Sequence, residues 1–577
     1  MCGILGGNIA GWDYEKGIER ICHRGPDGRR ILKYDDCTLG FVRLAIMDLS
    51  EKAMQPFVSE DGNIIVLFNG EIYGFHSLRN ILKQKYPFRT SSDTEVILYA
   101  YMEYGNRFID YIDGMFAIVI YDKRAGQLKL YRDRYGIKPL YYLYENHKFA
   151  FTSELKAFVA AGENGGDFRF RIDKTAVYDY LVYQYIPEPK SMYQHIYKLE
   201  PATCIHYDVR KKRIVRKEKY WNLKVCLKAH GNKKRADVLD DIKMLIRNSV
   251  QKQMVADVPV GTFLSGGVDS SIISYECSRI NPDVKSFSIG FENKDFDESR
   301  YAETVADVCH IKNVVSILSN QEISAVRGML QELYDEPFAD TSAYPTYIVS
   351  ALARKNVKVV LTGDGGDELF GGYERYRWLI NERKGKPVSG DWAERFLDKT
   401  RILDGQLKTL LRKTFESDLT TYTRIMGFFD KSMYASWRKK LGIDREYDNK
   451  WFLRKYYHKE MPAMTRMRYL DFKTYLPGDV LTKVDRTAMH VSLEARIPFL
   501  DRELVEYMFS LAEDEYFYDN ELKTLLKKTY EDVLPGEILY RKKKGFAIPA
   551  KYVASGNNTV YERILKLEWR QLCDAVL

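Results

Sequence analysis

A short glycine- and serine-rich segment in the middle of the chain places the strongest constraint on how the chain folds. It follows an apolar, strand-like run at residues 258–264 and opens a helical stretch, and it consists of Ser265, Gly266, Gly267, Val268, Asp269, Ser270 and Ser271. Small residues in succession expose backbone N–H groups, and the start of a helix adds partial positive charge. The segment therefore predicts a cradle for a phosphate group, although it does not have the Walker pattern. A simple strand-to-helix turn is the alternative, and the context favours the cradle.

Two further apolar runs, at residues 284–289 and 357–362, have helical patterns between them, and this alternation predicts a parallel sheet with crossover helices. The last run ends in Thr362, Gly363, Asp364, Gly365, Gly366, Asp367 and Glu368. Because the carboxyl ends of parallel strands meet at the ligand crevice, we expect Asp269 and Asp367 to approach one Mg²⁺ ion. Two aspartates that only cap helices are the alternative. Beyond about residue 400 the pattern is mainly helical.

The first half of the chain has a different pattern. Short apolar runs at residues 63–68, 115–121 and 127–131 are separated by turn signals, and a helical pattern covers residues 93–104. This mixture predicts an α+β layered domain. Apolar content falls near residues 208–235, so we expect one domain at residues 1–210 and a second at residues 235–577.

Composition narrows the class of protein. The 577 residues carry a formal net charge of +9, a weak excess that a mixed, solvated surface explains. The eight cysteines are scattered without a CxxC pair, so neither a zinc site nor a disulfide framework is indicated. No apolar run approaches the roughly 20 residues of a membrane span, and the N-terminus does not have the pattern of a secretory signal. We expect a cytoplasmic protein that binds neither membrane nor nucleic acid.

Cys2 becomes the first residue if Met1 is removed. A terminal cysteine carries a nucleophile and, in its α-amine, a base that can take the thiol proton. Asn69 and Gly70 follow a buried strand and could form an oxyanion hole. Arg43 could hold a carboxylate with its planar guanidinium, and Asp93 could pair with an ammonium. Taken one at a time, these residues have ordinary alternatives: a strand start, a turn, a surface ion pair and a helix cap.

Taken together, the motifs of the first half resemble the class II glutamine amidotransferase domain over roughly residues 2–200. The resemblance rests on MCGI, HRGPDG, RLAIMD, FNGEIY, SDTEV and DRYGIKPLYY in that order. It implies an N-terminal-nucleophile hydrolase sandwich with αββα layers, in which Cys2 is the nucleophile. Asn69 and Gly70 match the oxyanion positions, and the glutamine-binding positions match Arg43, Asn69, Glu71 and Asp93. His23 is expected to have only a structural role.

The second half resembles the PP-loop ATP pyrophosphatases, and over roughly residues 235–550 it resembles the asparagine synthetase family. The resemblance rests on SGGVDSS, on DEPFADTSAYPTY and LTGDGGDELFGGY, on KVDRTAMHVSLEARIPFLD and on RKKKGF. It implies that Leu264 and Ile289 face the adenine of ATP and that the glycine-rich segment, Thr362 and Gly363 contact the nucleotide. Lys543 matches a lysine that steadies pyrophosphate, with Lys542 and Lys544 as the alternatives in register. Asp364 occupies a position where the family often has glutamate. The resemblance implies that the carboxylate at this position assists the attack of ammonia.

The resemblance implies a complete reaction. Glutamine is hydrolysed at Cys2, ATP and Mg²⁺ activate a carboxylate as its adenylate, and ammonia crosses between the domains to displace AMP. With aspartate as acceptor the product is asparagine, and the family suggests a homodimer.

Four alternatives follow from the same residues. A sugar carboxylate could be the acceptor, since relatives of this build are found near genes for surface polysaccharides. A lactam-forming relative with a dead glutaminase is disfavoured by the intact Cys2, Arg43, Asn69 and Asp93. An RNA-modifying PP-loop enzyme is suggested by the net charge and disfavoured by the glutaminase half. A non-catalytic glutamine sensor or scaffold is disfavoured because every expected catalytic position is filled.

Overall fold

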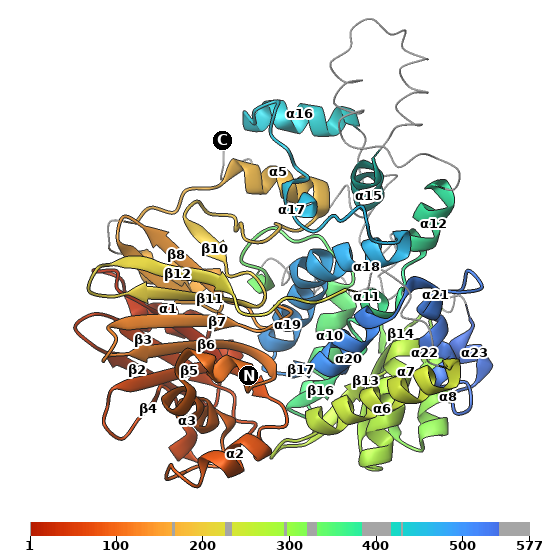
Figure 1. Ribbon diagram of the computed structural model, residues 1–577, viewed down its shortest axis with the longest axis horizontal. Helices are drawn as coiled ribbons and strands as arrows, with labels where there is room; N and C mark the ends of the chain where they lie inside the picture. The colour runs from red at the N-terminus through yellow and green to blue at the C-terminus, as the bar shows by residue number, and fades with distance from the viewer. Residues whose placement is uncertain are drawn as a thin grey trace, which may run out of the picture.

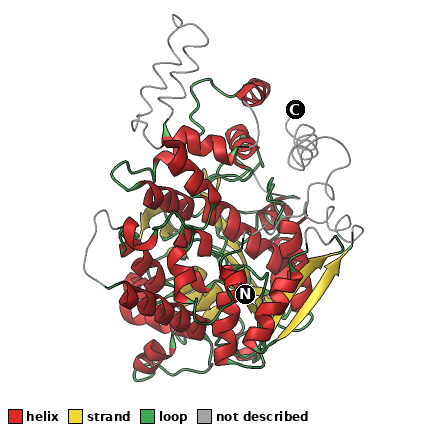
Figure 2. Ribbon diagram, turned by 90° about the vertical axis from the view of Figure 1, so that its right-hand side faces the viewer, coloured by secondary structure: helices red, strands yellow, loops and turns green. Residues whose placement is uncertain are grey.

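The computed structural model describes residues 2–163, 165, 168–225, 234–293, 297–319, 332–383, 417–427 and 431–541. Figure 1 shows two parts side by side: strands and helices from the first 220 residues, in red to yellow, and a sheet with many helices from the rest of the chain, in green to blue. Figure 2, turned by 90°, shows helices in front of the strands of the second part. None of the described helices is long and apolar enough to cross a bilayer.

The first part holds two six-stranded antiparallel sheets. One has the order β10-β8-β9-β1-β3-β2 and the other β12-β11-β7-β6-β5-β4. The strands of the first sheet are β1 (Gly3–Gly7), β2 (Gly28–Lys33), β3 (Thr38–Arg43), β8 (Tyr141–Glu145), β9 (Lys148–Thr152) and β10 (Ile196–Lys198). Those of the second are β4 (Phe57–Val58), β5 (Ile64–Ile72), β6 (Gly114–Asp122), β7 (Gln127–Arg132), β11 (Thr203–Asp208) and β12 (Arg213–Lys219).

Apolar side chains fill the space between these sheets and cover their outer faces. Ile4 and Phe41 of the first sheet pack in one buried cluster with Leu67 and Val119 of the second. The outer face of the first sheet packs against α1 (Tyr14–Arg20) and α4 (Leu155–Gly162), and that of the second against α2 (His76–Leu82) and α3 (Asp93–Tyr104). These layers confirm the expected αββα sandwich.

The second part is built on a five-stranded parallel sheet with the order β15-β14-β13-β16-β17. Its strands are β13 (Val260–Phe263), β14 (Lys285–Phe291), β15 (Lys312–Leu318), β16 (Val359–Leu361) and β17 (Glu494–Arg496). The connecting helices include α6 (Arg235–Gln253), α7 (Val268–Ile280), α8 (Ser299–Cys309) and α10 (Ala343–Arg354). The alternation of strand and helix confirms the predicted crossovers, while β15 and β17 were not predicted from the sequence.

The described chain beyond about residue 400 is mainly helical, as expected, and helices already begin at Gly366 and Glu374. The longer helices after residue 362 are α12 (Glu374–Arg383), α15 (Asp418–Met426), α16 (Lys431–Leu441), α18 (Ala463–Lys473), α19 (Leu481–His490) and α20 (Arg502–Ser510). The shorter ones are α11 (Gly366–Phe370), α17 (Trp451–Arg454), α21 (Glu513–Tyr516), α22 (Thr524–Thr529) and α23 (Gly536–Leu539), and a π-helical turn covers Leu476–Val480. The remaining helix of the first part is α5 (Lys174–Tyr183).

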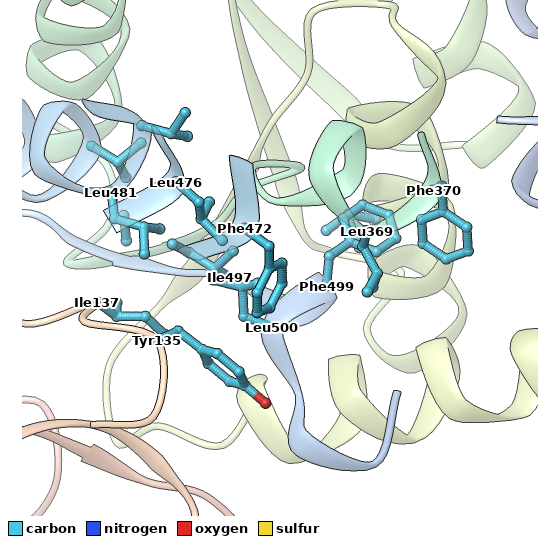
Figure 3. Close-up of a cluster of buried hydrophobic side chains, with 14 of the residues drawn as sticks. Tyr135, Ile137, Leu369, Phe370, Phe472, Leu476, Leu481, Ile497, Phe499 and Leu500 are labelled. Carbon is cyan, nitrogen blue, oxygen red and sulfur yellow. The ribbon is translucent and has the colours of Figure 1, made fainter. Parts of the chain in front are cut away.

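One buried apolar cluster runs across the junction of the two parts. Figure 3 shows Tyr135 and Ile137, from the loop after β7, facing Phe472, Leu476 and other side chains of the second part. The rings of Tyr135 and Phe472 lie edge to face with their centroids 5.6 Å apart. These side chains belong to one buried apolar cluster that includes residues of both parts. Because an apolar core crosses the junction, the two parts pack as one unit.

Candidate active sites

Cys2 lies at the start of β1 with 7% of its surface exposed. Its backbone nitrogen, the atom that becomes the α-amine if Met1 is removed, donates a 3.0 Å hydrogen bond to Oδ1 of Asn69 on β5. Within the described chain, Nδ2 of Asn69 is buried and has no hydrogen-bond partner. A Cβ atom added at Gly70 would collide with the carbonyl oxygen of Met115 on β6, so the strand pairing itself requires glycine there.

The surroundings of Cys2 favour the protonated thiol over the thiolate. Burial raises its pKa, and this effect outweighs the backbone N–H of Leu44 and the charge of Arg43, which both lower it. A buried thiol of this kind needs a base within reach before it can act as a nucleophile. If Met1 is removed, the nitrogen of the same residue becomes an amine that can act as this base.

The predicted glutamine-binding residues gather around Cys2. Arg43 ends β3, where its guanidinium donates to the carbonyl oxygens of Ser50, at 2.7 Å, and Asp48. Asp93 begins α3 after the capping residue Ser92, and its carboxylate accepts a 3.0 Å hydrogen bond from the backbone N–H of Ile72 on β5. Burial raises the pKa of Asp93 to about 6. Arg43 lies near enough to Cys2 to lower the pKa of its thiol, and Asp93 lies near enough to Glu71 on β5 to raise the pKa of that carboxylate.

Glu71, the fourth of these positions, is almost fully buried on β5. Burial, reinforced by the charge of Asp93, raises the pKa of Glu71 well above its usual range. Nη2 of Arg496 lies 3.3 Å from the Glu71 carboxylate, and Nε of Arg496 lies 2.7 Å from Glu494. Glu494 and Arg496 belong to β17 of the second part, and neither was predicted as a site residue.

A second group of buried charges joins the two parts beside Cys2. Arg24 donates two hydrogen bonds, of 2.9 and 3.2 Å, to Asp485 on α19, a third to Glu154, and a fourth, of 3.1 Å, to the carbonyl oxygen of Cys2. Arg486, the next residue on α19, also pairs with Glu154 at 3.0 Å. Arg24 comes from the HRGPDG motif, in which the sequence predicted a structural role for His23 and no role for Arg24.

The glycine-rich segment has the predicted cradle geometry between β13 and α7. Gly266 has a φ of 67°, a left-handed conformation that favours glycine, and α7 begins at Val268. Ser270 Oγ lies 3.0 Å from Ser265 Oγ and accepts a hydrogen bond from the Ser265 N–H. Ser271 Oγ is buried without a hydrogen-bond partner in the described chain. Backbone donors and a free hydroxyl thus line the start of the helix.

The two predicted metal-binding carboxylates converge on one point. Nζ of Lys523, just before α22, lies 2.5 Å from Oδ2 of Asp269 and 2.6 Å from Oδ1 of Asp367. Although burial lowers it, these two charges raise the pKa of Lys523 above its ordinary value. Lys523 was not predicted from the sequence. One cation thus bridges the two carboxylates that the sequence assigns to Mg²⁺. A Mg²⁺ ion in a phosphate site needs only one or two protein carboxylates, and this role for Asp269 and Asp367 stays a prediction.

The loop after β16 packs directly on this cradle. A Cβ atom added at Gly363 would lie 2.7 Å from the backbone nitrogen of Ser270, so only glycine allows the two segments to approach this closely. The N–H of Thr362 donates a 2.9 Å hydrogen bond to the carbonyl oxygen of Arg496. Of the expected adenine contacts, Leu264 directly follows β13 and Ile289 lies within the adjacent strand β14, and both are buried.

Asp364 lies within this loop, and its charge acts on Lys483 of α19. Lys483 lies 3.1 Å from Asp340 and donates a 2.9 Å hydrogen bond to Ser342. Burial lowers the pKa of Lys483, but the charges of Asp340, Asp364 and Asp479 together raise it above its ordinary value. The expected pyrophosphate lysine, Lys543, and its neighbours Lys542 and Lys544 lie outside the described residues.

Comparisons with known proteins agree with this two-site architecture. A family model described as glutamine amidotransferase domain matches residues 1–221, and one described as asparagine synthase matches residues 241–568. Asparagine synthetase [glutamine-hydrolyzing] 1 of Bacillus subtilis is 33% identical over 92% of this chain and 83% of its own length. A putative asparagine synthetase [glutamine-hydrolyzing] 2 of Methanocaldococcus jannaschii is 39% identical over 65% of this chain and 76% of its own length.

The matches cover both halves, and they fall on the same residues that form the two sites. Cys2, Asn69 and Asp93 lie within the amidotransferase match, while Asp269, Asp367 and Lys523 lie within the asparagine synthase match. The chain therefore belongs to the asparagine synthase family and is an ATP-dependent amidotransferase ligase.

Proposed function

We propose that this enzyme is a glutamine-dependent asparagine synthetase, which hydrolyses glutamine at Cys2 and uses the ammonia to convert β-aspartyl-AMP into asparagine. The observation that carries the proposal is the pair of sites in one packed unit: a cysteine with an oxyanion donor, and a phosphate cradle with two converging carboxylates. The names of the similar proteins support the same reaction.

Glutamine binding is assigned to the charged groups around Cys2. Arg43, held by the carbonyl oxygens of Asp48 and Ser50, faces the α-carboxylate of glutamine. Asp93, with Glu71 beside it, accepts the α-ammonium. Burial opposes ionisation of both carboxylates, and an incoming cation reverses that effect because an opposite charge favours the ionised form.

Hydrolysis begins with transfer of the Cys2 thiol proton to the α-amine of the same residue after Met1 has been removed. The sulfur then attacks the side-chain carbonyl carbon of glutamine, and the new oxyanion is stabilised by Nδ2 of Asn69 and the N–H of Gly70. The proton returns to the leaving nitrogen as ammonia departs, leaving a glutamyl thioester. Water then cleaves the thioester and releases glutamate. Nδ2 of Asn69 is suited to this role because it is buried and has no partner in the described chain.

Activation of aspartate is assigned to the second site. The segment from Ser265 to Ser271 holds the phosphates of ATP, and Gly363 permits the close approach of the opposite loop. Asp269 and Asp367 would hold Mg²⁺, which neutralises phosphate charge when bound. Lys523 orients both carboxylates. The β-carboxylate of aspartate attacks the α-phosphorus and pyrophosphate leaves, steadied by Lys543.

The second half-reaction needs ammonia and a group that accepts its proton. Asp364 is the carboxylate that we assign to this role. Its charge acts on Lys483, which pairs with Asp340 at 3.1 Å. Ammonia attacks the acyl carbon of the adenylate, AMP leaves, and the proton passes to Asp364. The apolar contact between Tyr135 and Phe472 keeps water out of the junction that ammonia crosses.

The test is release of AMP and pyrophosphate from ATP and Mg²⁺ with ammonia, in the presence of aspartate or of sugar acids such as glucuronate and galacturonate. Aspartate should give AMP and asparagine in equal amounts, and the sugar acids should give neither. AMP formed with a sugar acid but not with aspartate would contradict aspartate as the acceptor while leaving the amidotransferase chemistry in place.

A further inference from the structure

The proposed glutamine site is not formed by its own domain alone. Glu494 and Arg496 of β17, the edge strand of the ATP-binding sheet, are fully buried, and Arg496 contacts Glu71 of that site. Both side chains point toward the amidotransferase half, because Arg496 reaches Glu71 on β5. A three-residue strand that carries two fully buried charges is unusual, since charged side chains are rarely buried unless they are paired. These charges therefore have a specific partner across the domain junction.

Arg496 is held from several directions. Its Nη1 donates hydrogen bonds to the carbonyl oxygens of Gln253, at 2.7 Å, and Val255, at 2.6 Å, and its Nε donates to Glu494 at 2.7 Å. These contacts fix the plane of the guanidinium and aim Nη2 at Glu71. Within the described chain Nη2 is buried and has no hydrogen bond of good geometry; its contact with Glu71 is a 3.3 Å ion pair.

Other unsatisfied donors belong to the same region. Nδ2 of Asn69 and the hydroxyl of Tyr73, on either side of Glu71, are both buried without hydrogen-bond partners in the described chain. Burial raises the pKa of Tyr73, while the charge of Arg496 opposes that effect, so the hydroxyl lies within the field of the guanidinium. Buried polar groups are normally satisfied, and a cluster that is not calls for a ligand. The synthetase strand thus contributes directly to a ligand-binding surface of the other domain.

The backbone of the same residue supports the nucleotide site. The carbonyl oxygen of Arg496 accepts a 2.9 Å hydrogen bond from the N–H of Thr362. Gly363 follows and lies against Ser270 at the start of α7. A single residue therefore touches the glutamine pocket with its side chain and the nucleotide loop with its main chain.

We propose that Arg496 is a positioning residue that couples the two active sites: its guanidinium orients Glu71 for the ammonium of glutamine, while its carbonyl oxygen holds the loop that receives ATP. This inference rests on the proposed function. A change in the nucleotide loop would move Arg496 and with it the orientation of the Glu71 carboxylate. Because coupling is reciprocal, glutamine bound at Glu71 would also change the position of the loop. Filling the synthetase site should then improve glutamine use.

The primary test compares glutaminase kinetics of the wild type and Arg496→Lys, with and without ATP, Mg²⁺ and aspartate. Lysine keeps the charge but cannot make the four directed contacts of the guanidinium. We expect the KM for glutamine to rise by about tenfold or more in Arg496→Lys, and the stimulation by ATP and aspartate to disappear. Ammonia-dependent AMP formation should change by less than about threefold, because Arg496 contacts neither phosphate nor acceptor.

A matched control is Arg132→Lys. Arg132 is also buried, and its guanidinium also holds carbonyl oxygens, those of Lys138 and Gly136 at 2.9 and 2.8 Å. A general loss of packing would lower both activities in parallel, and Arg132→Lys should show only that pattern. If Arg496→Lys lowers glutamine-dependent and ammonia-dependent rates equally, or if ATP and aspartate do not stimulate the wild type, the coupling role is wrong.

A binding measurement separates this inference from the proposed function. Glutamine should raise the Tm of Cys2→Ala, and it should raise the Tm of the Cys2→Ala, Arg496→Lys double variant much less. Glu494→Gln, which is nearly the same size, provides a second variant should Arg496→Lys fold poorly, and it should weaken glutamine binding in the same way. Failure of the proposed function would appear as a wild type without asparagine formation, whereas unaltered glutamine binding in both variants would overturn only the role of Arg496.

Discussion

Arg24 of the amidotransferase half and Asp485 of the synthetase half form a buried, doubly hydrogen-bonded ion pair, with distances of 2.9 and 3.2 Å. The same guanidinium donates to the carbonyl oxygen of Cys2 at 3.1 Å, so the backbone of the nucleophile is anchored through a residue of the other domain. Although burial raises it, the charges of Arg24 and Lys138 hold the pKa of Asp485 below its ordinary value. The junction of the domains is therefore part of the glutaminase site.

This pair gives a first prediction about stability. Asp485→Ala leaves the buried guanidinium of Arg24 without its main partner and should lower the free energy of unfolding by about 3–5 kcal/mol. The measurement is the denaturation midpoint in urea. Asp532→Ala, which removes an exposed pair with Lys243, is the control and should cost less than about 1 kcal/mol. Equal effects of the two substitutions would contradict a structural role for the buried pair.

Lys523 gives a second prediction, about Mg²⁺. In Lys523→Gln the carboxylates of Asp269 and Asp367 face each other without the cation that bridges them, so they should bind Mg²⁺ more tightly even without ATP. Added Mg²⁺ should raise the Tm of Lys523→Gln more than that of the wild type. Lys528→Gln, at an exposed position of α22, the helix that follows Lys523, should behave as the wild type does. An identical response to Mg²⁺ in all three proteins would argue against a shared cation site.

The third prediction concerns the N-terminus. A variant that retains a residue before Cys2 keeps the buried thiol but loses the free α-amine that takes its proton. Because burial raises the pKa of this thiol, no thiolate compensates for the missing base. Glutaminase activity should fall by about 10²–10⁴-fold. Ammonia-dependent asparagine formation should be unchanged, and mass spectrometry of the N-terminus supplies the control. Full glutaminase activity with the extra residue present would rule out the α-amine as the base.

The fourth prediction follows from Asp93, whose pKa burial raises to about 6. The carboxylate must be ionised to bind the α-ammonium of glutamine, which stays protonated in this range. Glutamine binding should therefore weaken as the pH falls below about 6, by up to about tenfold per pH unit for a single proton. KM for glutamine between pH 5 and 8 is the measurement.

The unliganded enzyme should show the opposite trend in stability. Its Asp93 binds a proton more tightly when folded than when unfolded, so its contribution falls as the pH rises from about 4 to 6. Asp93→Asn should remove both the pH dependence of glutamine binding and the contribution of Asp93 to the pH dependence of stability. The ammonia-dependent activity should not show the pH dependence of the KM for glutamine. If the KM for glutamine does not change between pH 5 and 8, the ionisation of Asp93 does not determine glutamine binding.

Most of the fold was predictable because its strands are apolar and regular. The runs at residues 63–68 and 115–121 became β5 and β6, and the parallel sheet followed from alternating strands and helices. Glu494-Ala495-Arg496 could not be recognised as a strand, because two of its three residues are charged. Its burial depends on ion pairs with a distant segment, and no local pattern records those pairs.

The same reasoning explains the site residues that were missed. Lys523 stands far from Asp269 in the sequence and carries no motif that marks it, yet the fold places its ammonium on both predicted metal ligands. Arg24 lay inside a recognised motif, but its partner Asp485 lies in the other half of the chain. Local patterns singled out Cys2 and the glycine-rich segment, whose roles stay predictions, whereas contacts between domains required the structure.

The most direct test of the two-site reaction follows the nitrogen atom. The enzyme would be incubated with ATP, Mg²⁺, aspartate, glutamine labelled with ¹⁵N in its side-chain amide, and an equal concentration of unlabelled ammonium, and the asparagine would be analysed by mass. Our account predicts asparagine that carries mainly ¹⁵N in the wild type and only unlabelled nitrogen in Cys2→Ala. Unlabelled asparagine from the wild type, or no asparagine at all, would contradict it.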